Sequence, residues 1–176
     1  MNLGGIIAEL QKKGYIVTPV VSKSIPLIKA ELLNWQVYKN SKNNFSVEFP
    51  GEVKTETKTD GAEHVKHYTY WQSQKNPGIF TMGVEEMEIP EKKTAEYFFT
   101  HLEKQKDAQV ERLTFNGMKA MKASMSMNFI VSVRMQIYLI EDPAGKHLYK
   151  LMAMYPKDQQ GAEAAERFLN SFKQIK

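Results

Sequence analysis

Apolar and polar residues alternate along much of the chain after position 34, and this period of two is typical of half-buried β-strands. Phe45, Val47 and Phe49, for example, are separated from one another by single polar residues. Residues 147–155 are apolar at both odd and even positions, which predicts a central strand covered on both sides. The pattern predicts strands over residues 35–39, 45–49, 65–72, 79–87, 110–115, 118–125, 131–139 and 147–155.

Turn-forming sequences separate these strands. The Asn116-Gly117 pair is the strongest hairpin signal in the chain, because both residues tolerate the left-handed backbone of a two-residue turn. Residues 52–63 are polar and show no alternation, so they predict a loop with a turn at Asp60-Gly61.

Two segments have the helical period instead. A helix is predicted from Thr94 and another after Asp158, which is placed to cap it. The two apolar stripes consist of Ala95, Phe98, Phe99 and Leu102 in the first helix and of Ala165, Phe168, Leu169 and Phe172 in the second. Many strands and two main helices indicate an α+β fold.

Residues 1–34 lack the regular strand pattern of the rest of the chain. Helical spacing of apolar residues predicts a short helix over 3–13, and a strand over 15–21 and a second helix over 24–33 follow. We therefore expect an N-terminal appendage, residues 1–34, followed by a single α+β domain, residues 35–176. The appendage could dock to a partner or to a second copy of the chain.

The composition removes several classes of chemistry. The chain of 176 residues is 42% hydrophobic, which is enough for the core of one domain, and it contains no cysteine. Disulfides, thiolate metal sites, cysteine nucleophiles and a lipid-modified N-terminal cysteine are therefore excluded.

Charge and hydropathy limit the classes of partner and the cellular compartments that we expect. The net charge of +4 is interspersed along the chain and is carried mostly by lysine, so we expect no nucleic-acid partner. No uncharged stretch reaches the length of a membrane span, and Glu9 interrupts the first apolar run, which lacks a basic start. The sequence as written predicts a cytoplasmic protein, or a cell-envelope protein if the true N-terminus is missing or replaced.

Motifs for catalysis, cofactors and metals are missing from the sequence. There is no nucleophile elbow, zinc-protease helix, P-loop or dinucleotide fingerprint. His64 and His67 lie three residues apart in a predicted strand, where they face opposite sides, so we interpret them as surface residues. His101 and His147 have no catalytic neighbours in the sequence. We therefore predict no catalytic residue, cofactor or metal, although a site assembled in space stays open.

An acidic run ends the strand predicted over residues 79–87. Its carboxylates could bind a cation, but they lack the regular spacing and the turn glycine of a calcium loop. We interpret the run as a solvated strand end. Its members are Glu85, Glu86, Glu88 and Glu91.

Methionine is the unusual residue type in this chain. Seven methionines lie in the C-terminal strands: Met118, Met121, Met125, Met127, Met135, Met152 and Met154. Core packing is the ordinary role of such residues, an adaptable apolar binding surface is a second role, and Cu(I) ligation is a third. Two pairs project to one face of their strands, and these four residues are our candidate interaction surface: Met125, Met127, Met152 and Met154.

Several of the strand and turn sequences resemble a group of bacterial PsbP-like and DcrB-like domains. The resemblance rests on residues 44–51 (NFSVEFPG), on the hairpin at 115–117 (FNG), and on the closing segments 138–139, 148–151 and 168–172. It covers residues 35–176 and none of residues 1–34. It implies an antiparallel β-sheet with α-helices packed on both faces, an α/β/α sandwich.

The resemblance brings no catalytic residue with it. Proteins of this fold are mostly binding or accessory subunits, so it implies a non-enzymatic module that binds a protein partner through the sheet or an adjoining groove. One alternative is an effector-chaperone-like binder of apolar helices, which a methionine-lined groove would suit. The other alternative is an enzyme with a spatially assembled histidine and carboxylate site.

Overall fold

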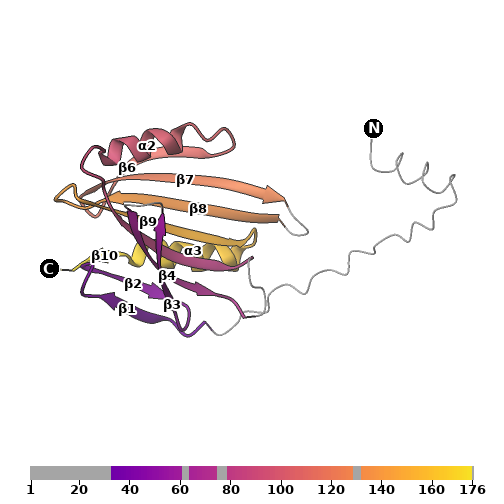
Figure 1. The fold of residues 1–176 in the computed structure, drawn as a ribbon. Helices are drawn as coiled ribbons and strands as arrows, with labels where there is room; N and C mark the ends of the chain where they lie inside the picture. Colours follow the sequence, from indigo (N-terminus) through magenta and orange to yellow (C-terminus); the bar gives the residue numbers. More distant parts are fainter. Residues whose placement is uncertain (1–32, 61–63, 75–78, 129–131, 176) are drawn as a thin grey trace, which may run out of the picture. The chain divides into compact units, whose positions relative to one another are not determined.

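The computed structural model describes residues 33–60, 64–74, 79–128 and 132–175 (Figure 1). Its strands form two antiparallel sheets, and two helices, α2 (Ala95–Glu103) and α3 (Gln159–Ser171), complete an α+β fold. The strands are β1 (Gln36–Asn40), β2 (Phe45–Phe49), β3 (Lys54–Asp60), β4 (His64–Gln72), β5 (Thr81–Glu88), β6 (Gln109–Phe115), β7 (Met118–Asn128), β8 (Ser132–Glu141), β9 (His147–Pro156) and β10 (Lys173–Gln174).

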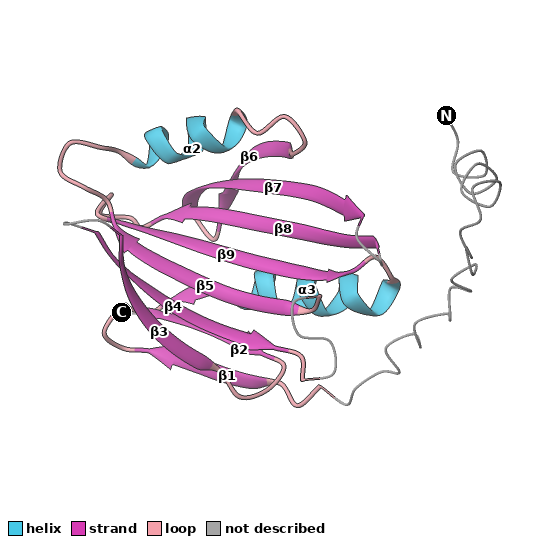
Figure 2. Cartoon of the chain, turned by 45° about the vertical axis from the view of Figure 1, so that its right-hand side comes forward, coloured by secondary structure: helices cyan, strands magenta, loops and turns pink. Residues whose placement is uncertain are grey.

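The large sheet has seven strands in the order β3-β4-β5-β9-β8-β7-β6 (Figure 2). Strand β9 lies in its middle, between β5 and β8, as the continuous apolar pattern of residues 147–155 predicts. The hairpin between β6 and β7 turns at Asn116 and Gly117, whose φ angles of 51° and 83° suit a two-residue turn. A second sheet of three strands, in the order β1-β2-β10, accompanies the large one.

Consecutive residues of β9 point to opposite sides of the large sheet. Leu148 belongs to an apolar cluster with Phe99 of α2, whereas the next residue, Tyr149, packs against Phe45 of β2 and against Phe172. We call these two sides the α2 side and the aromatic side. The register of the strands assigns every residue of the sheet to one of them.

Aromatic rings fill the aromatic side. Phe172 stacks on Phe45 with ring centroids 5.8 Å apart, and Tyr149 lies 5.2 Å from Phe172. Phe168 of α3 packs 5.2 Å from Phe49 of β2, and all four phenylalanines are 0–1% exposed. Burial of this many rings is the main source of stability that the described residues offer.

The start of α3 explains why this helix forms where the sequence predicts it. Asp158 precedes the helix in an extended conformation, and its Oδ1 accepts a hydrogen bond of 2.7 Å from the backbone N–H of Gly161. This contact satisfies one of the free N–H groups of the first turn.

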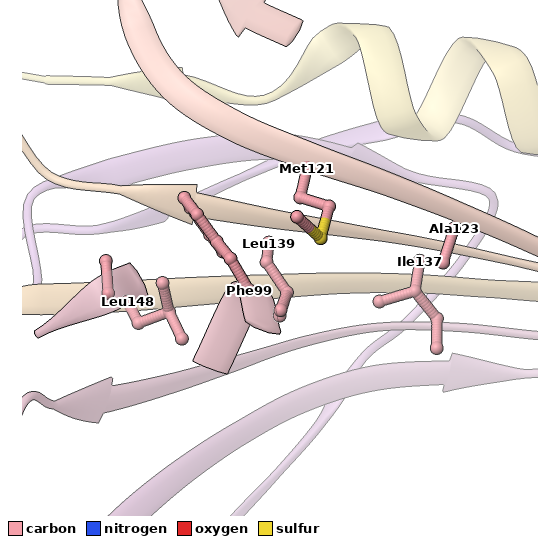
Figure 3. Packing of buried hydrophobic residues seen from close by; sticks show 7 residues of the cluster. Phe99, Met121, Ala123, Ile137, Leu139 and Leu148 are labelled. Carbon is pink, nitrogen blue, oxygen red and sulfur yellow. The ribbon is translucent and has the colours of Figure 1, made fainter. Parts of the chain in front are cut away.

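Helix α2 packs on the α2 side through the cluster of buried residues around Phe99, whose side chains Figure 3 shows. Phe99 packs with Met121, Leu139 and Leu148 of three different strands. Arg112 of β6 binds the outer face of the helix, because its guanidinium donates hydrogen bonds to Glu96 at 2.9 Å and to Glu103 at 2.8 Å.

The structure corrects one prediction and adds a strand. Residues 54–60, which we predicted to be part of a loop, form the edge strand β3. This strand alternates threonine with charged residues and exposes residues 54–59, so no apolar period marks it. Strand β10 was not predicted. The elements predicted in residues 1–34 lie outside the described residues except for 33 and 34, and so does Gly61 of the turn predicted at Asp60-Gly61.

Candidate functional site

The four candidate methionines share one side of the large sheet. Met125 pairs with Met135 of β8, and Met135 pairs with Met154 of β9, so a row of three methionines crosses β7, β8 and β9. By strand alternation, Met127 and Met152 lie on the same side, next to this row. All five are half-buried. We call them the methionine surface: Met125, Met127, Met135, Met152 and Met154.

Other methionines of the chain do belong to the core. Met82 and Met121 are 0% exposed and Met118 is 6% exposed. Met125, Met135 and Met152 pack at the margin of the cluster under α2 while keeping part of their surface open. Sequence reasoning left Met135 out of the candidate surface, although its alternation with Val133 and Ile137 could have identified it.

A hollow adjoins the methionine surface over β4, β5 and β9. It has a volume of about 230 Å³, and its lining includes Tyr68, Tyr70, Thr81, Gly83 and Met152. A methyl group on Gly83 would lie 3.2 Å from Cβ of Tyr70, so the missing side chain helps to keep the hollow open.

Charged side chains line the edge of this hollow. Glu85 receives Lys150 Nζ at 3.1 Å on one oxygen and Lys66 Nζ at 3.5 Å on the other. The two lysines neutralise the charge of the Glu85 carboxylate. The hollow therefore has apolar residues at its base and a charge-paired carboxylate at its edge.

A second and larger cavity of about 990 Å³ lies at another place in the fold. The turn between β1 and β2, strands β4 and β5, the segment before α2, and the start of β9 all contribute to it. Glu86, Glu88 and His147 line it together. His147 Nε2 lies 3.9 Å from Oε1 of both Glu86 and Glu88, which is too long for a hydrogen bond.

The turn before β9 positions His147. Asp142 is 8% exposed, and its Oδ1 accepts hydrogen bonds from the backbone N–H groups of Lys146 at 2.7 Å and His147 at 2.9 Å. Its other oxygen, Oδ2, lies 3.5 Å from Nδ1 of His147. Gly145 permits the tight turn with a φ of 68°. The imidazole therefore has a buried carboxylate on one side and the cavity on the other.

Glu86 is the most unusual group in this cavity. Its side chain is 7% exposed, and its Oε2 has no hydrogen-bond partner among the described residues. Burial raises the pKa of Glu86 above its usual value, and His147 and the Asn43 side chain offset part of this effect. Our interpretation of the acidic run as a solvated strand end is therefore wrong for Glu86. The residue follows Met82 and Val84 at a spacing of two, so it faces the aromatic side with them.

The remaining histidines contribute less. His67 also lines the cavity, and its Nδ1 lies 3.1 Å from Oγ1 of Thr57. His101 is exposed on α2. The side chain of His64 lies outside the described part. The turn thus places His147 beside Asp142, five residues away, and the sheet brings it to Glu86 and Glu88, which lie far from it in the sequence. The sheet also pairs His67 with Glu86.

The described residues contain neither a candidate metal site nor a candidate membrane-spanning helix. They contain no group of three histidine, aspartate or glutamate side chains that could hold a metal ion. In the described part of the chain, neither helix has the length and apolar character needed to cross a lipid bilayer.

Comparisons with known proteins concern the fold alone. No family model and no curated protein matches the sequence. A crystal structure from Bacteroides thetaiotaomicron VPI-5482 is similar, with a TM-score of 0.50 and 12% identity over 80% of this chain; the match covers 48% of that chain, so this protein spans about half of its length. The solution structure of cyanobacterial PsbP from Synechocystis sp. PCC 6803 has a TM-score of 0.49 and 14% identity over 84% of this chain and 96% of that one. Cyanobacterial PsbP, whose family the sequence motifs resemble, is one of these two structural neighbours.

Proposed function

We propose that this protein is a non-enzymatic binding module and that its methionine surface receives an apolar helix of a partner protein. One observation carries the proposal: five half-buried methionines lie side by side on one side of a central sheet. Methionine side chains are flexible and polarisable, so a surface made of them can adapt to an apolar partner. An effector-chaperone-like binder of apolar helices would use its surface in this way.

Helix α2 supports the choice of a helix as the partner element. This short amphipathic helix already packs its apolar stripe on the same side of the sheet, with Phe99 between Met121 and Leu148. The methionine surface continues from the margin of that contact. A partner helix with apolar residues at i, i+3, i+4 and i+7 would extend the layer that α2 begins.

The hollow over Gly83 supplies a place for an anchoring side chain. Its volume of about 230 Å³ and its lining by Tyr68, Tyr70 and Met152 suit one large apolar residue of the partner. The proposal takes α2 and α3 to lie on opposite faces of the sheet. Two contacts favour this arrangement: α2 packs on Leu148, whereas Phe168 of α3 packs on Phe49 of the aromatic side.

The test uses a synthetic amphipathic peptide of leucine and lysine that folds as a helix. The protein carries ¹³C only in its methionine methyl groups, and the peptide is titrated into it during NMR measurement. We expect the methyl signals of Met125, Met152 and Met154 to shift, whereas those of the fully buried Met82 and Met121 stay in place. Shifts confined to other methionines, or no saturable shift, would contradict the proposal.

Matched variants locate the binding on the methionine surface. Met154→Gln places a polar amide in the middle of the row and should weaken peptide binding about tenfold. Val37→Gln makes a comparable change at an exposed apolar residue of β1 (61% exposed) that belongs to the other sheet. Equal affinities of the two variants would place the bound peptide elsewhere.

The convergence of His147, Glu86 and Asp142 favours a second candidate function, acid–base catalysis. Asp142 orients one nitrogen of the imidazole, and the other nitrogen faces a buried carboxylate whose pKa is raised. A p-nitrophenyl ester serves as the probe. His147→Ala should lose hydrolysis above the imidazole background, and His101→Ala, changed at an exposed histidine of α2, should retain it. Equal rates for both variants would exclude this candidate.

A further inference from the structure

The cavity that contains Glu86 has a carboxylate oxygen that the described residues leave unpaired. Glu86 is 5% exposed, and its Oε2 is fully buried without a donor among the residues described. A buried carboxylate normally receives a cation or several hydrogen bonds, because an isolated buried charge loses its hydration without compensation. The site is therefore built for a donor that a ligand would bring.

The neighbouring side chains do not supply this donor: His67 pairs with Glu86 across β4 and β5 and Asn43 also lines the cavity, yet Oε2 has no hydrogen-bond partner among the described residues. His147 Nε2 stays 3.9 Å from Oε1 of Glu86, the other oxygen of the carboxylate. The turn at Asp142 holds the backbone of His147, and Asp142 Oδ2 faces the opposite ring nitrogen at 3.5 Å. A shift of the ring toward Glu86 would draw it away from Asp142.

Cations also line this cavity. Lys42 and Lys92 line it and are exposed, and neither forms a salt bridge with another residue that the structure describes. Lys93 also lines it, but its Nζ lies 4.3 Å from the ring centroid of Tyr97. The side chains of Lys42 and Lys92 can therefore hold an anionic group.

Apolar side chains complete the lining. Val65, Met87, Ile89 and Pro90 contribute to a cavity of about 990 Å³, which is at the upper end of the sizes that small ligands fill. An aliphatic body can lie along these residues while its polar ends reach the charged groups.

We propose that this cavity binds a small zwitterion, a molecule with an ammonium group at one end and a carboxylate at the other, as in an ω-amino acid. The ammonium group donates to Oε2 of Glu86, and the carboxylate lies near Lys42 and Lys92. An ammonium group suits Glu86 because it brings both a positive charge and N–H donors to a buried carboxylate. The proposal requires binding only, and it is independent of the partner helix on the methionine surface.

The test uses three probes of equal length at pH 7.5. They are 6-aminohexanoate, hexylamine, which lacks the carboxylate, and hexanoate, which lacks the ammonium group. Binding is followed by ¹H–¹⁵N NMR titration of the full chain. We expect saturable shifts around Glu86 and His147 with 6-aminohexanoate, binding a few-fold weaker with hexylamine, and no saturation with hexanoate. Hexanoate binding as tightly as 6-aminohexanoate would overturn the proposal and make the cavity an anion site.

A pair of glutamate variants separates the site from general effects of charge. Glu86→Gln removes the acceptor charge with little change of shape and should weaken 6-aminohexanoate about tenfold or more. Glu85→Gln changes the next residue of β5, which points to the α2 side and is bonded to Lys150, and it should bind the probe as the wild-type protein does. Thermal unfolding confirms that both variants are folded. Unchanged binding by Glu86→Gln, or absence of saturable binding of 6-aminohexanoate to the wild type, would refute the assignment.

Discussion

The two sides of the large sheet are covered in different ways. On the aromatic side, Phe45, Phe172 and Tyr149 pack ring against ring, and their exposed fractions are 0–2%. On the α2 side, a helix of nine residues covers Met121 and Leu148, and the methionine surface beyond it stays half-exposed. One side of the same strands is thus closed by packed rings, and the other keeps part of its apolar area exposed. The difference can be tested by changing one residue at a time.

Phe172→Ala should have the largest effect. The ring is 0% exposed and contacts Phe45, Tyr149 and Phe115, so its removal leaves a cavity that costs about 3–5 kcal/mol of unfolding free energy. Guanidinium unfolding followed by circular dichroism measures the loss. A loss below about 1 kcal/mol would show that the aromatic side does not carry the stability of the fold.

Phe99→Ala should have the next largest effect, about 3 kcal/mol, because this 4% exposed ring joins α2 to three strands. A helix of nine residues is too short to persist without its packing. Amide hydrogen exchange should therefore accelerate in α2 more than in α3, which keeps its own buried face. Equal acceleration in the two helices would mean that they unfold as one unit and that the two sides are not independent.

The sequence predicts most of this architecture because its signals are local. Strand alternation identified β2 and β5 to β9 to within a few residues, and Asn116-Gly117 located the hairpin. The same period of two assigned Met125, Met127, Met152 and Met154 to candidate faces, because alternation alone decides which residues of one strand share a side. Strand β3 was missed because an edge strand with no buried face needs no apolar period.

The cavity around Glu86 could not be predicted in the same way. Glu86 comes from β5, whereas Asp142 and His147 share the turn that leads into β9, so only strand pairing brings Glu86 to the other two. The register aligns Glu86 with Tyr149 and Glu88 with His147, and this alignment is a property of the assembled sheet. Sequence alternation could have shown that Glu86 is buried, but its neighbours depend on the fold.

Glu86→Gln tests the cavity on the aromatic side by its effect on stability. Because burial raises the pKa of Glu86, its ionised form destabilises the folded state at pH values above the ordinary value of 4.5. The amide variant should gain about 1 kcal/mol at pH 7, and the gain should vanish as the pH falls below 4.5, where both states are protonated. Urea unfolding across this pH range measures the difference.

Glu85→Gln is the matched control for this prediction, since its carboxylate is bonded to Lys150 and paired with Lys66. It should lose stability at pH 7 instead of gaining it, because the change removes the carboxylate that Lys150 and Lys66 contact. A loss in Glu86→Gln at pH 7 would show that the cavity does hold a donor for Glu86 in the unliganded protein. A gain in Glu85→Gln would show that the effect of removing a carboxylate from β5 is not specific to position 86.

Met154→Gln should have the smallest effect on stability, below about 1 kcal/mol, although it lies in the central strand of the sheet. The residue is half-buried, so an amide at this position can turn its polar end to water. Guanidinium unfolding of Met154→Gln beside Phe172→Ala compares the two sides directly. A loss of more than about 2 kcal/mol would mean that an amide at position 154 cannot reach water. The methionines would then belong to the core, and the α2 side would be as closed as the aromatic side.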